Sequence, residues 1–183
     1  MPQLKPLLAP AVACPWPVVE PVHPWPILQL LILLMLANGT PVVAKKILGE
    51  RLAYPFDWGV KFIDGRPRFG RSKTIRGVLL AVLVTMAGAP LIGLQWEIGF
   101  LVGSLAMAGD LVSSFLKRRM ALPPSSRASG LDQVPEALLP LLACRNPLSL
   151  TMADIGATAA LFFIGEIFLS RVLYAFRLRD RPY

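Results

Sequence analysis

The fold class of this 183-residue chain is decided by the segment Gly109-Asp110-Leu111-Val112-Ser113-Ser114-Phe115-Leu116-Lys117-Arg118-Arg119. There a long apolar run ends in an acid, two hydroxyls and three adjacent cations. On a helix, Asp110, Ser114 and Lys117 follow the i, i+4, i+7 spacing and share one face. A carboxylate inside a membrane helix is costly, so Asp110 marks a candidate functional site. The alternative is a charge cluster that ends a membrane span, with the acid paired inside a bundle.

Composition agrees with a membrane protein, because 55% of residues are hydrophobic and only 16% are charged. Several apolar runs approach the ~20 residues that a membrane-spanning helix needs. We therefore expect an all-α integral membrane protein with one compact bundle. Cys14 and Cys144 lack metal-ligand spacing, and His23 is the only histidine, which excludes a zinc site and a histidine-based catalytic triad.

Proline and apolar runs divide the chain into two parts. Residues 1–26 form a proline-rich segment in which we expect no regular helix. Residues 27–183 form the membrane-embedded domain, and its first span covers 27–37, extends towards Val43 and is interrupted at Asn38-Gly39-Thr40-Pro41. The other expected spans cover 75–94, 98–116, a short proline-flanked 134–144, and 152–176.

The net charge of +8 is distributed very unevenly between these spans. Nine of the 19 lysines and arginines lie in 45–76, and four lie in 117–130. Four more lie at the C-terminal end, counting Arg171 of the last span with Arg177, Arg179 and Arg181, whereas Lys5 and Arg145 stand alone on the other side. With five crossings, the positive-inside rule places the N-terminus outside, and both basic loops and the C-terminus in the cytoplasm. Because the cations flank apolar spans, they do not indicate nucleic-acid binding.

The first basic loop has the residue types of a polyphosphate site. Glycines at 65, 70 and 77 let the backbone turn and approach a ligand closely. Lys73, Thr74 and Arg76 supply donors at the start of a helix, where free amide groups also attract anions. The alternative is a basic loop that rests on anionic lipid headgroups.

The second basic loop contains the acid Asp132 in otherwise basic surroundings. Asp132 and Asp110 together suit Mg²⁺, which prefers one or two carboxylates plus substrate phosphates. Such an ion would neutralise charge during displacement at phosphorus. The alternative is that Asp132 only pairs with Arg127 or Arg119, an interaction worth ~0–1 kcal/mol when exposed.

From residue 37 onwards, the chain resembles the CDP-archaeol synthase family, which is related to the CDP-diacylglycerol synthases. Five segments carry the resemblance in the family's order: Ala37-Asn38-Gly39-Thr40-Pro41, Phe62-Ile63-Asp64-Gly65-Arg66, Phe69-Gly70 through Lys73-Thr74-Ile75-Arg76-Gly77, Gly109 through Arg119, and Leu131-Asp132-Gln133. The tail Leu178-Arg179-Asp180-Arg181-Pro182-Tyr183 resembles the family's closing motif.

The resemblance implies a cytidylyltransferase that uses CTP, Mg²⁺ and a lipid phosphate in the cell membrane, within a five-helix fold whose polar cavity faces the cytoplasm. It implies that Asp110 and Asp132 organise metal and phosphates. It further implies phosphate contacts and cavity-lining side chains, at Lys73, Thr74, Arg76, Lys117 and Arg118 for the phosphates and at Asn38, Thr40, Asp64 and Ser114 for the cavity. Asp110, Lys117 and Asp132 are the implied catalytic group.

The chain departs from the family pattern after the Leu-Asp-Gln motif, where a second acid is usual. Here Pro135 stands at that place and Glu136 follows it, while Glu166 is an acid deep in the last span. A non-catalytic membrane protein that binds anionic lipids through its basic loops is the alternative function. The acceptor lipid and the oligomeric state stay open at this point, because ether-linked and ester-linked chains are both apolar.

Overall fold

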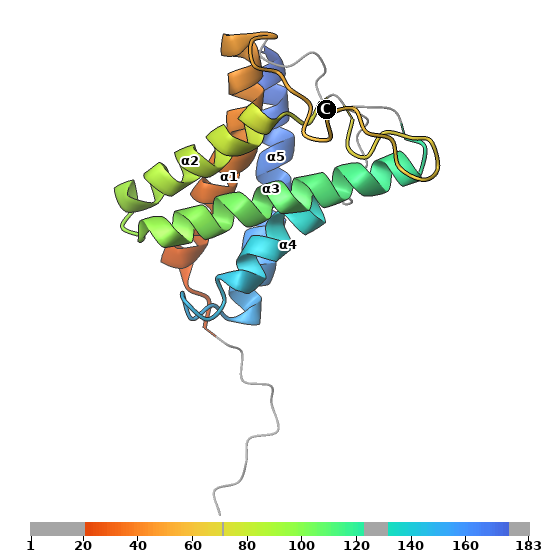
Figure 1. Ribbon diagram of the computed structural model, residues 1–183. Helices are drawn as coiled ribbons and strands as arrows, with labels where there is room; N and C mark the ends of the chain where they lie inside the picture. The colour runs from red at the N-terminus through yellow and green to blue at the C-terminus, as the bar shows by residue number, and fades with distance from the viewer. Residues whose placement is uncertain (1–20, 71, 123–131, 176–183) are drawn as a thin grey trace, which may run out of the picture.

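The computed structural model describes residues 21–70, 72–122 and 132–175, and the regular structure of these residues is a bundle of five helices (Figure 1). They are α1 (Pro24–Leu48), α2 (Ile75–Leu91), α3 (Trp96–Arg119), α4 (Gln133–Ala143) and α5 (Met152–Ala175). The expected all-α fold is confirmed. Arg71, Arg127, Leu131 and the basic tail lie outside the described residues.

The helices differ in whether they are long enough to cross a membrane. α1, α3 and α5 are long and apolar enough to do so, whereas α2 has 17 residues. The expected short fourth segment is indeed a helix, but α4 has only 11 residues. At 1.5 Å per residue it is about 16 Å long, roughly half of a ~30 Å hydrocarbon core. α4 is therefore too short to cross the membrane by itself.

α1 corrects two expectations. It begins at Pro24, inside the segment where no helix was expected. The backbone N–H groups of a helix's first turn have no partner within the helix, so prolines in that turn remove no helical hydrogen bond. It also runs without a break through Asn38-Gly39-Thr40-Pro41, so the expected interruption is wrong. Pro41 removes one backbone donor, and the Thr40 hydroxyl donates to the Leu36 carbonyl at 2.6 Å within the same helix.

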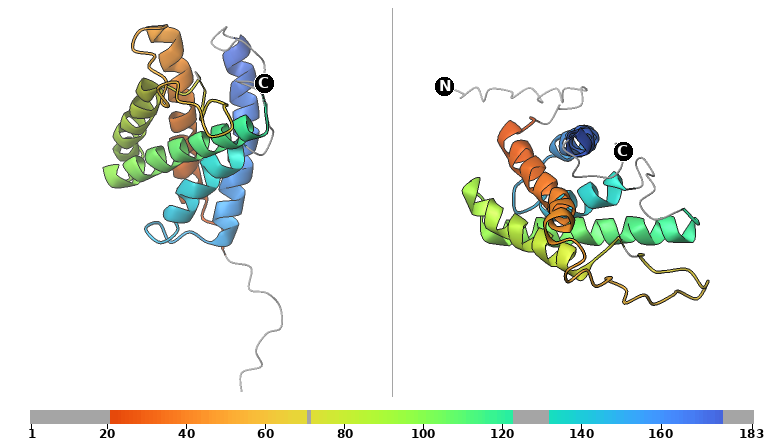
Figure 2. Two further views of the ribbon diagram at one scale, coloured as in Figure 1. Left: turned by 45° about the vertical axis from the view of Figure 1, so that its right-hand side comes forward. Right: turned by 90° about the horizontal axis from the view of Figure 1, so that it is seen from above.

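α1 and α5 begin at the same end of the bundle and run side by side in the same direction (Figures 1 and 2). The His23 backbone N–H donates to Asp154 Oδ1 at 2.7 Å, and His23 Nδ1 lies 2.8 Å from Asp154 Oδ2. Asp154 also accepts from the Thr151 N–H, and Thr151 Oγ1 accepts from the Asp154 N–H, which is a capping box. His23 thus links the starts of α1 and α5.

Small residues bring α3 close to two of its neighbours, α2 and α4. A Cβ at Gly99 would lie 2.5 Å from the Thr85 carbonyl oxygen of α2. A Cβ at Gly109 would lie 2.4 Å from the Pro135 carbonyl oxygen at the start of α4. Close backbone approach through small residues is typical of membrane helix pairs. The contact at Gly109 places the first turn of α4 beside Asp110.

Candidate functional site

Two ion pairs form the centre of the candidate site. The Lys73 ammonium contacts both carboxylate oxygens of Asp110, and Lys117 Nζ lies 2.7 Å from Asp132 Oδ1. The side chains of Lys73 and Asp110 are 22% and 20% exposed to solvent, so water reaches the pair. The four residues come from the loop before α2, from α3 and from the residue that precedes α4.

Lys73 connects the two pairs electrostatically. Burial by itself would lower the pKa of the Lys73 ammonium, but the Asp110 carboxylate outweighs burial and holds the pKa above its ordinary value. Asp132 and Glu136 act on Lys73 in the same direction. The acids that the sequence predicted to converge, Asp110 and Asp132, therefore lie around one lysine. The alternative pairing of Asp132 with Arg119 is wrong, since Arg119 binds Asp64 instead.

Glu136 is the site residue to which sequence reasoning assigned no firm role. Its carboxyl group shares a side-chain hydrogen bond with Asp110, and its burial leaves only 5% of the residue exposed. Two carboxyl groups in contact need a proton or a cation between them. Glu166 of α5 adds a further acid whose charge acts on Glu136. The signal in the sequence was the acid directly after Pro135, but only the packing of α4 on α3 reveals its partner.

Four predicted site residues have local partners outside this cluster. Thr40 donates to its own helix, and Thr74 caps α2 by accepting from the Gly77 N–H at 3.3 Å. Arg76 donates to the backbone carbonyls of Arg51 and Gly49, the latter at 2.5 Å, and so binds the end of α1. Asp64 accepts from the Arg119 guanidinium at 2.5 Å. Their roles toward a substrate stay predictions.

The remaining predicted residues are Asn38, Ser114 and Arg118. Ser114 and Arg118 are buried on α3, at 3% and 6% exposure. Asn38 of α1 has a buried amide nitrogen, Nδ2, without a hydrogen-bond partner among the described residues. A buried donor left without a partner is costly, so the Asn38 amide is available to a ligand.

The basic loop docks onto the C-terminal part of α3 through aromatic rings and one arginine. The rings of Phe62 and Phe69 lie 5.3 and 6.3 Å from the ring of Phe115. The Arg119 guanidinium lies 4.7 Å from the Phe62 ring centroid and 4.9 Å from that of Phe115, within the range of cation–π attraction. This docking carries the loop across α3 and fixes the segment that ends in Lys73.

Asp57 organises the interior of this loop, and sequence reasoning did not identify it. Its carboxylate accepts backbone hydrogen bonds from Gly59 at 3.0 Å, Phe69 at 3.0 Å and Gly70 at 3.1 Å. Burial works to raise the pKa of Asp57, but these three bonds outweigh it and hold the pKa below 3.8. The Asp-x-Gly turn pattern at 57–59 was the available signal.

Replacing Asp57 with asparagine is expected to destabilise the loop by about 2–3 kcal/mol, because charge-assisted hydrogen bonds are lost and an amide donor faces backbone donors. In the unaltered protein, the Asp57 contribution is complete above pH 3.8 and is lost as the pH falls through the lower folded-state pKa. Hydrogen exchange at the Phe69 and Gly70 amides measures both effects. Glu50→Gln changes an exposed acid whose carboxylate takes no part in the hydrogen bonds of Asp57, so it should leave this exchange unchanged.

The acids at the site suit a divalent cation in one particular way. Among the described residues, no group of three histidine, cysteine or acidic side chains is arranged to enclose a metal ion. The contact between Asp110 and Glu136 nevertheless offers carboxylate oxygens in a place that water reaches. Mg²⁺ typically keeps several waters and uses one or two carboxylates with substrate phosphates. The residues present fit that mode of binding.

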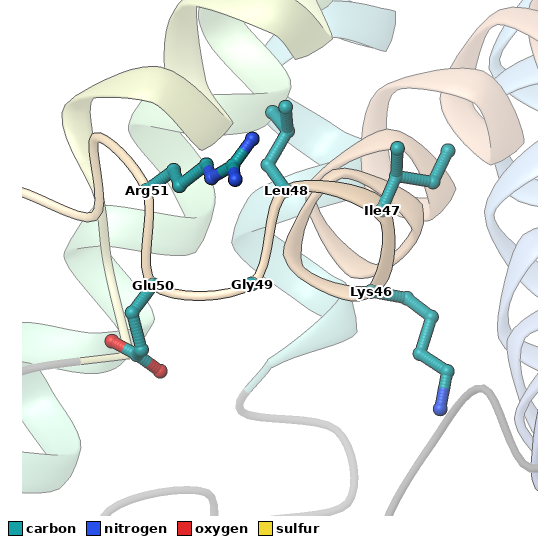
Figure 3. A pocket seen from close by; sticks show the side chains of 6 residues that line it. All are labelled: Lys46, Ile47, Leu48, Gly49, Glu50 and Arg51. Atoms are coloured by element: carbon teal, nitrogen blue, oxygen red, sulfur yellow. The ribbon is translucent and has the colours of Figure 1, made fainter.

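A hollow of ≈ 610 Å³ lies away from this cluster, at the C-terminal end of α1 (Figure 3). It is lined by the segment from Lys46 to Arg51, and it includes none of the predicted site residues. In Figure 3, Arg51 reaches back toward Leu48, whereas Lys46 and Glu50 extend the other way. We therefore base the site on the ion pairs around Lys73 and not on this hollow.

Curated relatives match between 53% and 86% of this chain. A CDP-archaeol synthase of Sulfurisphaera tokodaii is 32% identical over 155 residues, which are 81% of this chain and 90% of the relative. One from Pyrobaculum calidifontis is 32% identical over 165 residues, which are 86% of this chain and 98% of the relative. One from Pyrococcus furiosus is 42% identical over 107 residues, which are 53% of this chain and 60% of the relative.

A solved structure, described as an intramembrane enzyme for archaeal membrane lipids biosynthesis, has a similar fold. It matches with a TM-score of 0.62 and 29% identity, covering 75% of this chain and 90% of the other chain. Finally, a family model described as CarS-like, CDP-archaeol synthase, matches residues 26–183, which include every predicted site residue. The chain belongs to the CDP-archaeol synthase family.

Proposed function

We propose that this protein transfers the cytidylyl group of CTP to a lipid phosphate of the archaeal ether type, giving a CDP-lipid and pyrophosphate. One observation carries the proposal: Lys73, Asp110, Lys117 and Asp132 converge from separate elements of a chain that the CDP-archaeol synthase model matches over residues 26–183. A phosphate-handling site needs cations to hold the triphosphate and acids to organise a divalent ion.

The proposed site faces the cytoplasm of the cell membrane, and the N-terminus lies outside. Support comes from the parallel course of α1 and α5, which both begin at the linked pair of His23 and Asp154. The first basic loop follows the C-terminal end of α1, and it docks at the C-terminal end of α3 beside the cations Lys117, Arg118 and Arg119. The positive-inside rule favours the cytoplasm for such a concentration of cations.

The reaction is an in-line displacement at phosphorus. An oxygen of the lipid phosphate forms a bond to the α-phosphorus of CTP, and the bond from that phosphorus to the β-phosphate oxygen breaks, releasing pyrophosphate. The attacking phosphate is already an anionic nucleophile, so no residue has to remove a proton from it. Positioning and charge neutralisation can then supply most of the acceleration.

The residues of the cluster divide these tasks. Lys73 and Lys117 are the cations that we assign to the triphosphate, because each is held at a carboxylate and partly reached by water. Asp110 and Glu136 would hold the divalent cation, which we propose is Mg²⁺, with Asp132 as a further oxygen donor. When bound, that ion supplies charge neutralisation at the phosphates. The buried amide of Asn38 is a candidate donor to the substrate.

The decisive experiment is an assay of the purified, detergent-solubilised protein with labelled CTP, Mg²⁺ and a panel of phosphorylated lipids. We expect a labelled CDP-lipid and stoichiometric pyrophosphate, with ether-linked acceptors preferred to ester-linked ones. Chelation of divalent ions should abolish the product, and added Mg²⁺ should restore it. Retention of anionic lipid without product from any acceptor would instead support the lipid-binding alternative.

A further inference from the structure

An apolar cup lies at the junction of the first basic loop and α2, apart from the cluster around Lys73. It has a volume of ≈ 260 Å³, and it is lined by Leu52, Tyr54, Trp58, Ile75, Arg76 and Leu79. The Arg76 guanidinium is engaged by backbone carbonyls at the end of α1, so that its aliphatic stem is what lines the cup. The lining is therefore mainly hydrocarbon and aromatic.

The side chains at the rim of the cup are exposed although they are large and apolar. Trp58 is 74% exposed, Leu52 67%, Tyr54 59% and Leu79 57%. The rings of Tyr54 and Trp58 are stacked with centroids 6.4 Å apart, so they form one continuous surface. Exposed apolar patches with polar surroundings mark interaction sites.

The position of the cup indicates a lipid surface as its partner. Leu79 and Leu83 are exposed one helical turn apart on α2, and Leu79 is also a wall of the cup. The cup therefore lies at the end of the apolar outer face of α2, where this helix meets the basic loop. Tryptophan and tyrosine are enriched at that level of a membrane protein, and the exposed Arg51 beside Leu52 suits an anionic headgroup.

We propose that the cup, with Tyr54 and Trp58 at its rim, inserts into the headgroup region of the lipid bilayer and is filled by the chain of a bilayer lipid. The loop is then an interfacial anchor as well as a carrier of site residues. This proposal is independent of the proposed transfer reaction, because it concerns the bilayer and not the substrate of the site.

The anchor is joined directly to the site by a short antiparallel pairing. The Phe56 N–H donates to the Lys73 carbonyl at 2.8 Å, and the Ile75 N–H donates to the Tyr54 carbonyl at 3.1 Å. The backbone on either side of Thr74, at Lys73 and Ile75, is therefore bonded to the residues that flank Pro55. Docking of the cup on the membrane holds this pairing and, through it, the ammonium of Lys73 at Asp110.

Fluorescence quenching tests the insertion on the full chain. Trp58 becomes the only tryptophan when Trp16, Trp25 and Trp96 are changed to phenylalanine, and the protein is reconstituted in vesicles of phosphatidylcholine and phosphatidylglycerol. We expect brominated acyl chains to quench Trp58, more strongly with bromine near the headgroups than near the chain ends. Strong quenching by aqueous acrylamide without quenching by brominated lipid would overturn the proposal. Quenching by neither reagent would indicate a cover of protein, for example a second copy, and would also overturn it.

A spin label gives a second measurement if the single-tryptophan protein does not fold. With Cys14→Ser, and with Cys144 fully buried, Tyr54→Cys introduces one accessible thiol for labelling. We expect a label there to collide more with membrane-dissolved oxygen than with an aqueous nickel chelate. Arg68→Cys, at an exposed cation of the same loop, is the matched control and should show the opposite preference. Equal preference for the aqueous reagent at both positions would contradict the anchor.

Discussion

Asp110→Asn is expected to reduce CDP-lipid formation by about 100-fold or more while the protein remains folded. Asparagine has nearly the shape of aspartate and can still accept a hydrogen bond from Lys73, so the packing of α3 is retained. It lacks the negative charge that holds the Lys73 ammonium and that would bind a divalent cation with Glu136. Product formation from labelled CTP and thermal unfolding in the same detergent measure the two quantities separately.

The matched control for this change is Glu97→Gln, which makes the same carboxylate-to-amide exchange in α3. Glu97 lies in the first turn of that helix, is exposed and is far along the helix from Asp110. It should leave both activity and unfolding temperature unchanged. If the Asp110 and Glu97 variants turned over equally, the acids of α3 would have no part in the reaction and the proposed site would be wrong.

Gly109→Ala is expected to cost about 1–3 kcal/mol of stability and most of the activity, because the added methyl group has no room. Its Cβ would lie 2.4 Å from the Pro135 carbonyl oxygen and 2.7 Å from the Glu136 backbone nitrogen. Backbone atoms cannot rotate away as a side chain can, so α4 must shift and take Glu136 and Asp132 with it. Thermal unfolding, together with the KM and kcat for CTP, reports both effects.

Gly156→Ala is the control that separates packing from helix propensity. Gly156 also lies within a helix, α5, but a Cβ there meets no atom within 4 Å. Alanine should be neutral or more stable by about 0.5–1 kcal/mol, since glycine is the poorer helix former. A Gly109→Ala protein as stable and active as the Gly156→Ala protein would contradict the close contact between α3 and α4.

The two changes distinguish the chemistry of the site from its assembly. Asp110→Asn removes one charge from a preserved framework, so its effect should lie mainly in turnover. Gly109→Ala keeps every charged group and moves one helix, so stability and turnover should fall together. Removal of Asp110 without loss of activity, combined with a damaging Gly109→Ala, would mean that the α3–α4 contact serves the fold alone.

Sequence reasoning was most accurate where a property depends on residues that are close in the chain. The apolar runs predicted the helices, and the spacing of Asp110 and Lys117 placed both on the side of α3 that meets the cluster. It failed at Pro41, where proline and its neighbours predicted an interruption that the helix does not have. In an apolar bundle, helical backbone bonds have no competing water, so one missing donor is tolerated.

Partners distant in the chain could not be predicted in this way. Arg76 was assigned to the phosphates and Asp64 to the cavity, yet Arg76 binds backbone carbonyls just after α1 and Asp64 binds Arg119. Asp57 orders the basic loop through backbone donors, whose positions depend on how the loop folds. A charged side chain takes whichever partner the fold brings within reach, and its own sequence neighbourhood does not specify that partner.

By itself, the sequence determined that this is a helical membrane protein with cations concentrated at its loops and with the acids and lysines of a phosphate-handling family. Hydropathy and charge are sums over residues that are close in the chain, so they can be evaluated without knowledge of the fold. Only the tertiary structure decided that Glu136 meets Asp110 and that Lys73 pairs with Asp110 within the electrostatic reach of Asp132 and Glu136. The contact between Asp110 and Glu136 depends on Gly109, because only a residue without a side chain lets the backbone of α4 pack this closely against α3.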